Sequence, residues 1–104
     1  MNVEQGKYSG LYHDLRNKIP KALNKEFKDN KFVVRHDLIK CMIDSYKVKI
    51  DPLDFPDRGE RRDMMDEDKL RRVTSIKKFV SLIVLDNGFK PYGRKYNVKC
   101  YERI

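Results

Sequence analysis

The fold depends most on residues 66–88, which read DEDKLRRVTSIKKFVSLIVLDNG. The acids at the start suit the positive N-terminal end of a helix. Apolar side chains then recur at intervals of three and four residues, the period of one buried helix face. They are Leu70, Val73, Ile76, Phe79, Val80, Ile83 and Val84. Gly88 stands where a left-handed residue caps a helix. The stretch predicts a long helix from Asp66 or Glu67 to Asn87.

A basic hairpin is predicted after this helix. Residues 89–92 and 95–104 have the composition of two strands, joined at Gly93 and Arg94. Pro91 cannot donate to a ladder, so the first strand should be short or at an edge. Residues 70–104 hold nine Lys or Arg against two acids, a local charge of +7 in a chain of net charge +8. A basic helix and a basic hairpin suit a nucleic-acid groove and its phosphates.

The first predicted helix begins after Gly10. Its apolar residues recur every four positions as far as Phe27. Pro20 removes an amide donor and disfavours helix at the residue before it, so we expect a break or kink near residues 18–19.

A short strand at residues 31–34 and a second helix are predicted next. His36 or Asp37 should cap that helix, whose apolar face spans residues 38–46. Residues 48–50 read as a brief extended piece. The predicted core draws on every helix. Its members are Leu15, Leu23, Phe27, Leu38, Met42, Ile76, Phe79, Val80 and Ile83.

Residues 51–65 are predicted to be a long acidic loop. Eight acids and four bases lie between positions 51 and 69, together with Pro52, Pro56 and Gly59. Such a length exceeds most ordered connections. The loop either keeps a basic protein soluble or serves a function. We expect one domain over residues 1–104, with a flexible N-terminus at residues 1–9.

Catalytic and metal-binding patterns are weak in this sequence. The two histidines, His13 and His36, lack a second ligand at a zinc-site spacing. Cys41 and Cys100 read as buried free thiols. No apolar run is long enough for a membrane span, and no signal segment is recognised. We therefore expect a cytoplasmic protein that is not an enzyme and needs no cofactor or metal.

The order helix, strand, helix, loop, long helix and hairpin resembles the winged helix-turn-helix superfamily. The stretch VTSIKKF at residues 73–79, running on to DNGF at residues 86–89, is similar to that superfamily's recognition helix and its exit into the wing. The resemblance covers residues 11–104. It implies a small α+β domain of three or four helices plus a C-terminal β-hairpin. The family has a tight turn where this chain has the long acidic loop.

In this superfamily the third helix enters the major groove, and the wing touches the backbone or the minor groove. The resemblance thus implies contact residues by position. On the helix they are Arg71, Arg72, Thr74, Ser75, Lys77 and Lys78, and on the hairpin Lys90, Tyr92, Arg94 and Lys95. Basic side chains suit phosphates, and Arg also reads guanine. The alternative for the helix charges is a solvated face, and for Tyr92 packing within the hairpin.

These features predict a small basic nucleic-acid-binding protein with duplex DNA as its partner. We expect a transcription regulator or accessory factor of a phage or mobile element, since a richness in Lys, Asn, Ile, Tyr and Asp is typical of AT-rich genomes. The alternative is a phage-type inhibitor or adaptor, such as an anti-CRISPR or a polymerase inhibitor, that binds a host protein or nucleoprotein. The sequence leaves the oligomeric state open, a homodimer included.

Overall fold

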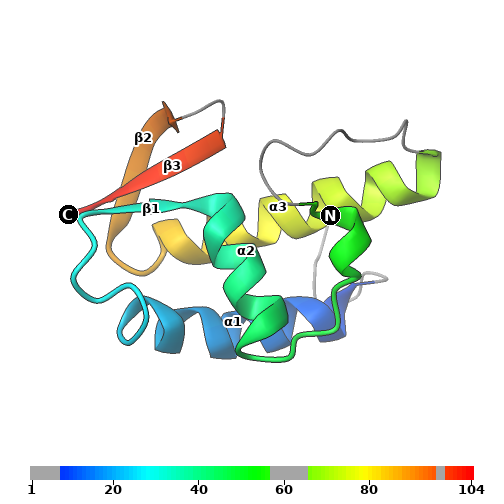
Figure 1. Ribbon diagram of the computed structural model, residues 1–104, viewed down its shortest axis with the longest axis horizontal. Helices are drawn as coiled ribbons and strands as arrows, with labels where there is room; N and C mark the ends of the chain where they lie inside the picture. Colours follow the sequence, from blue (N-terminus) through cyan, green and yellow to red (C-terminus); the bar gives the residue numbers. More distant parts are fainter. Residues whose placement is uncertain (1–7, 57–65, 96–97) are drawn as a thin grey trace.

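Three α-helices and a three-stranded antiparallel sheet make up residues 8–56, 66–95 and 98–104, which the computed structural model describes (Figure 1). The elements follow in the order α1 (Ser9–Leu23), β1 (Phe32–Val34), α2 (Arg35–Asp44), the 3₁₀ helix η2 (Pro52–Asp54), α3 (Glu67–Leu85), β2 (Phe89–Lys95) and β3 (Val98–Arg103). The predicted α+β class is confirmed. The sheet exceeds the predicted hairpin because β1 pairs with β3 as a third strand.

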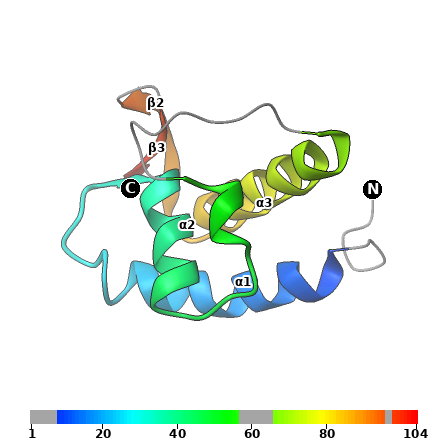
Figure 2. The same ribbon diagram turned by 45° about the vertical axis from the view of Figure 1, so that its right-hand side comes forward.

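The core lies where the three helices meet the inner face of the sheet. Figures 1 and 2 show α1 running alongside α3, with α2 crossing next to both and the sheet beside the C-terminal half of α3. Eight of the nine side chains predicted to form the core are buried. The ninth, Phe27, is only partly buried and packs against the core from outside.

Of the break or kink predicted near residues 18–19, the break is wrong. Helix α1 is continuous from Ser9 to Leu23 with Pro20 inside it. It also begins at Ser9, whereas the sequence predicted a start after Gly10. Proline lacks an amide donor and its ring crowds the carbonyl of the preceding turn, but its own carbonyl still accepts a hydrogen bond from the amide of Asn24 at 3.1 Å. Complete burial of the neighbouring Ile19 offsets the lost donor. Because the helix ends at Leu23, Phe27 lies in a turn.

Helix α2 begins earlier than predicted. It starts at Arg35 directly after β1, and its N-cap is Val34, which makes no side-chain hydrogen bond. His36 and Asp37 thus lie in the first turn and do not cap the helix. Residues 48–50 form no strand, although Val48 and Ile50 are both buried in the core.

The long helix α3 is confirmed over most of its predicted length. Asp66 is its N-cap, with Oδ1 accepting a hydrogen bond from the amide of Lys69 at 2.7 Å. The helix ends at Leu85, and Gly88 has the predicted left-handed backbone with φ of 85°. Leu70 is the exception on the predicted apolar face, because 53% of it is exposed. It lies at the edge of that face, next to Thr74.

The predicted turn at Gly93 and Arg94 is also wrong, because both residues lie inside β2. The register jumps from Pro91↔Tyr101 to Gly93↔Cys100, so a bulge at Tyr92 lets the strand continue to Lys95. Residues 96–97 lie outside the described part. The sheet order β1-β3-β2 places β2 at an edge, as Pro91 predicted, but with seven residues the strand is not short.

Candidate nucleic-acid interface

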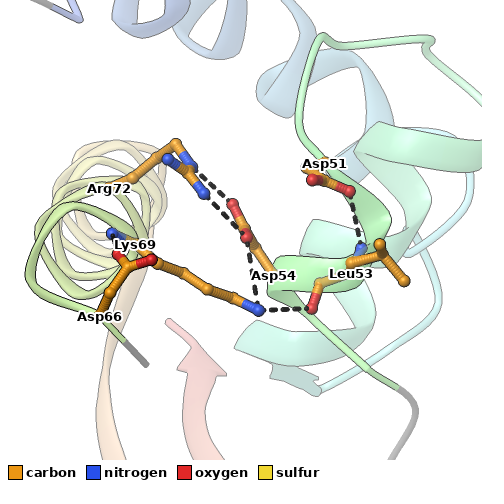
Figure 3. Close-up of polar contacts among 6 residues, drawn as sticks. All are labelled: Asp51, Leu53, Asp54, Asp66, Lys69 and Arg72. Carbon is orange, nitrogen blue, oxygen red and sulfur yellow. Dashed lines mark hydrogen bonds and ion pairs between the residues drawn. The ribbon is translucent and has the colours of Figure 1, made fainter. Parts of the chain in front are cut away.

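A buried carboxylate in the acidic segment fixes the N-terminal half of α3. Asp54 is 1% exposed. Its Oδ2 accepts a hydrogen bond from Nε of Arg72 at 2.7 Å, and its Oδ1 accepts one from Nη2 at 3.1 Å. The Nζ of Lys69 lies 3.9 Å from Oδ1 and donates to the carbonyl oxygen of Leu53 at 3.3 Å. Figure 3 shows both basic side chains reaching from α3 to η2.

Local hydrogen bonds prepare each side of this contact. Asp51 caps η2 by accepting from the amide of Leu53 at 3.0 Å, while Asp66 caps α3 as described above (Figure 3). Phe55, next to Asp54, is fully buried and anchors the segment in the core. The hydrogen bond to Asp54 raises the pKa of Arg72, so its guanidinium stays charged. The start of the predicted acidic loop is therefore attached to α3. Residues 57–65 lie outside the described part.

Three of the predicted contact residues share one exposed stripe of α3. Arg71, Thr74 and Lys78 are all exposed, and their spacing of three and four residues places them on the same side of the helix. The Nη2 of Arg71 also lies 2.6 Å from an oxygen of Glu67, one turn earlier. That pair is solvent-exposed, so it costs little to separate when a phosphate competes for the guanidinium.

The other three predicted helix residues lie off this stripe. Arg72 points to Asp54 and has its Nε and one Nη engaged there. Ser75 and Lys77 are half-buried at opposite margins of the stripe. The structure thus brings together half of the predicted helix set and separates the remainder from it.

The hairpin contributes exposed residues on β2. Lys90 is exposed, and its Nζ lies 3.5 Å from Oε1 of Glu102. Tyr92 is 55% exposed at the bulge. Arg94 and Lys95 belong to β2 by their backbone, but their side chains lie outside the described part, so their predicted role as contacts stays a prediction.

Sequence reasoning missed two polar groups that position these elements. Arg35 at the start of α2 donates from Nη1 to the hydroxyl of Ser81 at 3.3 Å, and Ser81 hydrogen-bonds the hydroxyl of Tyr101. Burial raises the pKa of Tyr101, which therefore stays neutral. These two hydrogen bonds link α2, α3 and β3. No local sequence signal pairs residues so far apart.

The second missed group is Arg103 in β3. Its guanidinium donates to the backbone carbonyl oxygens of Leu23 at 3.2 Å, Phe27 at 2.6 Å and Asn30 at 3.1 Å. It also lies over the ring of Phe89, 4.7 Å from its centroid. Arg103 is one of the nine basic residues between positions 70 and 104. In the structure it holds the turn between α1 and β1 against the sheet.

Within the described residues, no three His, Cys, Asp or Glu side chains cluster as metal ligands would. Cys41 and Cys100 are free thiols, the first half-buried and the second buried. Burial, with a smaller effect of Glu26, raises the pKa of Cys41 and so disfavours its thiolate. The described helices include none with the length and apolar character needed to cross a membrane.

Comparisons with protein-family models, with curated proteins and with solved structures found no match to this chain.

Proposed function

We propose that this protein binds duplex DNA as a winged helix, with the exposed stripe of α3 in the major groove and the β2–β3 hairpin as the wing. The observation that carries the proposal is the stripe itself, where Arg71, Thr74 and Lys78 line up on one side of a long helix. Two long cations and a short hydroxyl are the side-chain types that contact phosphates and base edges.

The connectivity supports this proposal. A winged helix needs its third helix and its hairpin adjacent in the chain, so that both face one stretch of duplex. Here α3 passes into β2 through only three residues, 86–88, and β2 pairs with β3 at the sheet edge. The exposed Lys90, the second residue of β2, supplies a further cation. The net charge of +8 adds long-range attraction to a polyanion.

The test is the salt dependence of binding to a random duplex, read by fluorescence anisotropy. The double variant Arg71→Ala/Lys78→Ala should weaken binding and lower the slope of log K against log salt by about 1.8, because each phosphate contact contributes about 0.9. Lys21→Ala is the control for the loss of one positive charge, half the charge that the double variant removes. Lys21 is exposed on α1, which packs against the buried side of α3.

The control variant should keep the parent slope. Equal slopes for the parent and the double variant would overturn the placement of α3 in the groove. A weak, uniform loss in every variant, Lys21→Ala included, would show that only net charge acts.

A specific observation favours a second candidate, an inhibitor or adaptor that binds a host protein. Leu82 and Leu85 continue the exposed stripe beyond Lys78, and 48% and 37% of them are exposed. A DNA groove does not need these leucines, whereas a protein partner would bury them. Under this proposal Leu82→Ser/Leu85→Ser should abolish capture of a partner from host lysate after nuclease treatment. It should leave DNA binding unchanged.

A further inference from the structure

The outer face of the sheet carries a pair of exposed aromatic rings. Phe32 of β1 and Tyr92 of β2 meet across β3, with ring centroids 4.7 Å apart in an edge-to-face arrangement. Phe32 is 36% exposed and Tyr92 55% exposed. The core lies behind the opposite face, where Val33 and Tyr101 are buried.

The register explains why these rings meet. Phe32, Glu102 and Lys90 form one row across the three strands. Tyr92 is two residues beyond Lys90 and therefore points to the same face, and the bulge at Tyr92 inserts it without a partner on β3. The bulge thus brings the Tyr92 ring within reach of Phe32 on the far edge strand.

Two cations flank the rings. The Nζ atoms of Lys31 and Lys90 lie 3.7 Å and 3.5 Å from the two carboxylate oxygens of Glu102. Their side chains are 63% and 58% exposed. Lys31 and Lys90 share the single carboxylate of Glu102, so these three side chains together carry a net positive charge. Both lysines are exposed and lie at the long end of ion-pair distances from the 22%-exposed Glu102, which leaves their ammonium groups accessible to an anion.

A purely protective role does not account for these rings. Cys100 lies on the same face, two residues before Glu102, and is fully buried although it is not part of the main core cluster. More than a third of Phe32 and more than half of Tyr92 stay exposed on the face that also carries the two lysines.

We propose that this face is a second nucleic-acid subsite, on which an unpaired base of a single strand stacks against Phe32 and Tyr92 while Lys31 and Lys90 hold the adjacent phosphates. The inference deepens the proposed function and rests on it, because the strand would lead from the duplex held by α3. Stacking on aromatic rings within a positive groove accepts any base sequence. Charge complementarity selects a nucleic acid over an apolar protein segment.

The test compares binding of a fluorescent oligo(dT) single strand and of a random duplex. Tyr92→Ala should weaken binding to the single strand by about 5- to 150-fold, since one stacked base contributes about 1–3 kcal/mol. Binding to the duplex should weaken by a clearly smaller factor, because Tyr92 is only one contact of the wing and the phosphate contacts of α3 are intact. Tyr92→Phe keeps the ring and should bind the single strand as the parent does, whereas Tyr92→Leu keeps apolar bulk and should not.

Two further arms separate stacking from charge and from misfolding. Inorganic polyphosphate has the charge without bases, so Tyr92→Ala should leave its binding unchanged. Tyr92→Leu should lower the urea midpoint only slightly, because leucine keeps an apolar contact with Phe32 although the edge-to-face ring pair is lost. A single-strand affinity that Tyr92→Ala and Tyr92→Leu leave unchanged would overturn the subsite.

Failure of this inference is distinguishable from failure of the proposed function. If duplex binding depends on Arg71 and Lys78 but neither Tyr92 variant has an effect, the stacking subsite is wrong and the duplex site stands. If the Tyr92 variants lose the single strand while Arg71→Ala/Lys78→Ala leaves duplex binding intact, the subsite stands and α3 is not the duplex reader.

Discussion

Replacing Asp54 with Asn should destabilise the protein and strengthen its binding to DNA. Asn keeps the size of Asp, but its amide accepts through one oxygen and presents an NH2 group to the donors of Arg72. Hydrogen bonds to charged groups contribute about 1.5–3 kcal/mol, and removal of a partner from a fully buried ion pair costs about 3–5 kcal/mol. Asp54 is 1% exposed but the Arg72 side chain is 38% exposed, so water compensates the cation. We therefore expect the lower range for Asp54→Asn.

The same variant releases a cation beside the exposed stripe of α3. Once Asp54 no longer holds it, the guanidinium of Arg72 can turn to a phosphate, and each added contact steepens the salt slope by about 0.9. Urea denaturation and anisotropy titrations with a random duplex measure the two effects on one preparation.

Asp51→Asn is the matched control. It removes the same charge from the same segment, and its amide oxygen still accepts from the amide of Leu53, because Asn is as good a cap as Asp. It should change stability by less than about 0.5 kcal/mol, because the cap and its hydrogen bond are kept. Two results would refute the reasoning: an Asp54→Asn variant as stable as Asp51→Asn, or an equal gain in DNA binding for both.

Three further predictions concern the scaffold. Ile83→Ala should lower the free energy of unfolding by about 2–5 kcal/mol, because the side chain is 3% exposed in the core; a loss below about 0.5 kcal/mol in urea would contradict its burial. Lys47 has a left-handed backbone with φ of 54°, so Lys47→Gly should raise stability by about 0.5–1 kcal/mol, while Lys47→Ala, which keeps a Cβ, should not. The hydrogen bond to Glu26 raises the pKa of Tyr46 to about 12 from its ordinary 10. The neutral phenol is thus favoured in the folded state. The stability that it contributes is fully present below pH 10 and should be lost as the pH rises from 10 to 12. In an ultraviolet titration, Glu26→Ala should return the pKa of Tyr46 toward its ordinary 10.

Local chemistry explains which parts of the fold were predictable. Helix α3 has its start at an acidic cap and its end near a glycine, and its apolar period lies between them, so all signals agree. Pro20 shows the opposite case. The local rule predicts a break, but the burial of Ile19 and its neighbours keeps α1 intact. The hairpin turn was misplaced because a bulge at Tyr92 depends on pairing with β3, which no local pattern of Pro and Gly encodes.

The candidate interface divides in the same way. The stripe of Arg71, Thr74 and Lys78 follows from helical spacing alone, once the helix is recognised. The ion pair that turns Arg72 away from the stripe does not follow from spacing. Its partner Asp54 is 18 residues away, in a segment with many carboxylates. Phe55, which is fully buried in the core, holds the neighbouring Asp54 beside α3. The start of the acidic segment, which composition presents as a solvated loop, thus sets how much positive charge α3 offers.

Adjacent lysines on α3 offer the sharpest test of this conclusion. Lys77 and Lys78 are adjacent and have the same chemistry, but Lys78 is exposed on the stripe, whereas Lys77 is half-buried at its margin. If the stripe faces the duplex, Lys78→Ala should lower the salt slope by about 0.9 and Lys77→Ala by clearly less, at equal net charge. Equal losses from both variants would mean that the helix attracts DNA by its charge as a whole. The number of Lys and Arg residues in the sequence would then describe the interface better than the stripe does.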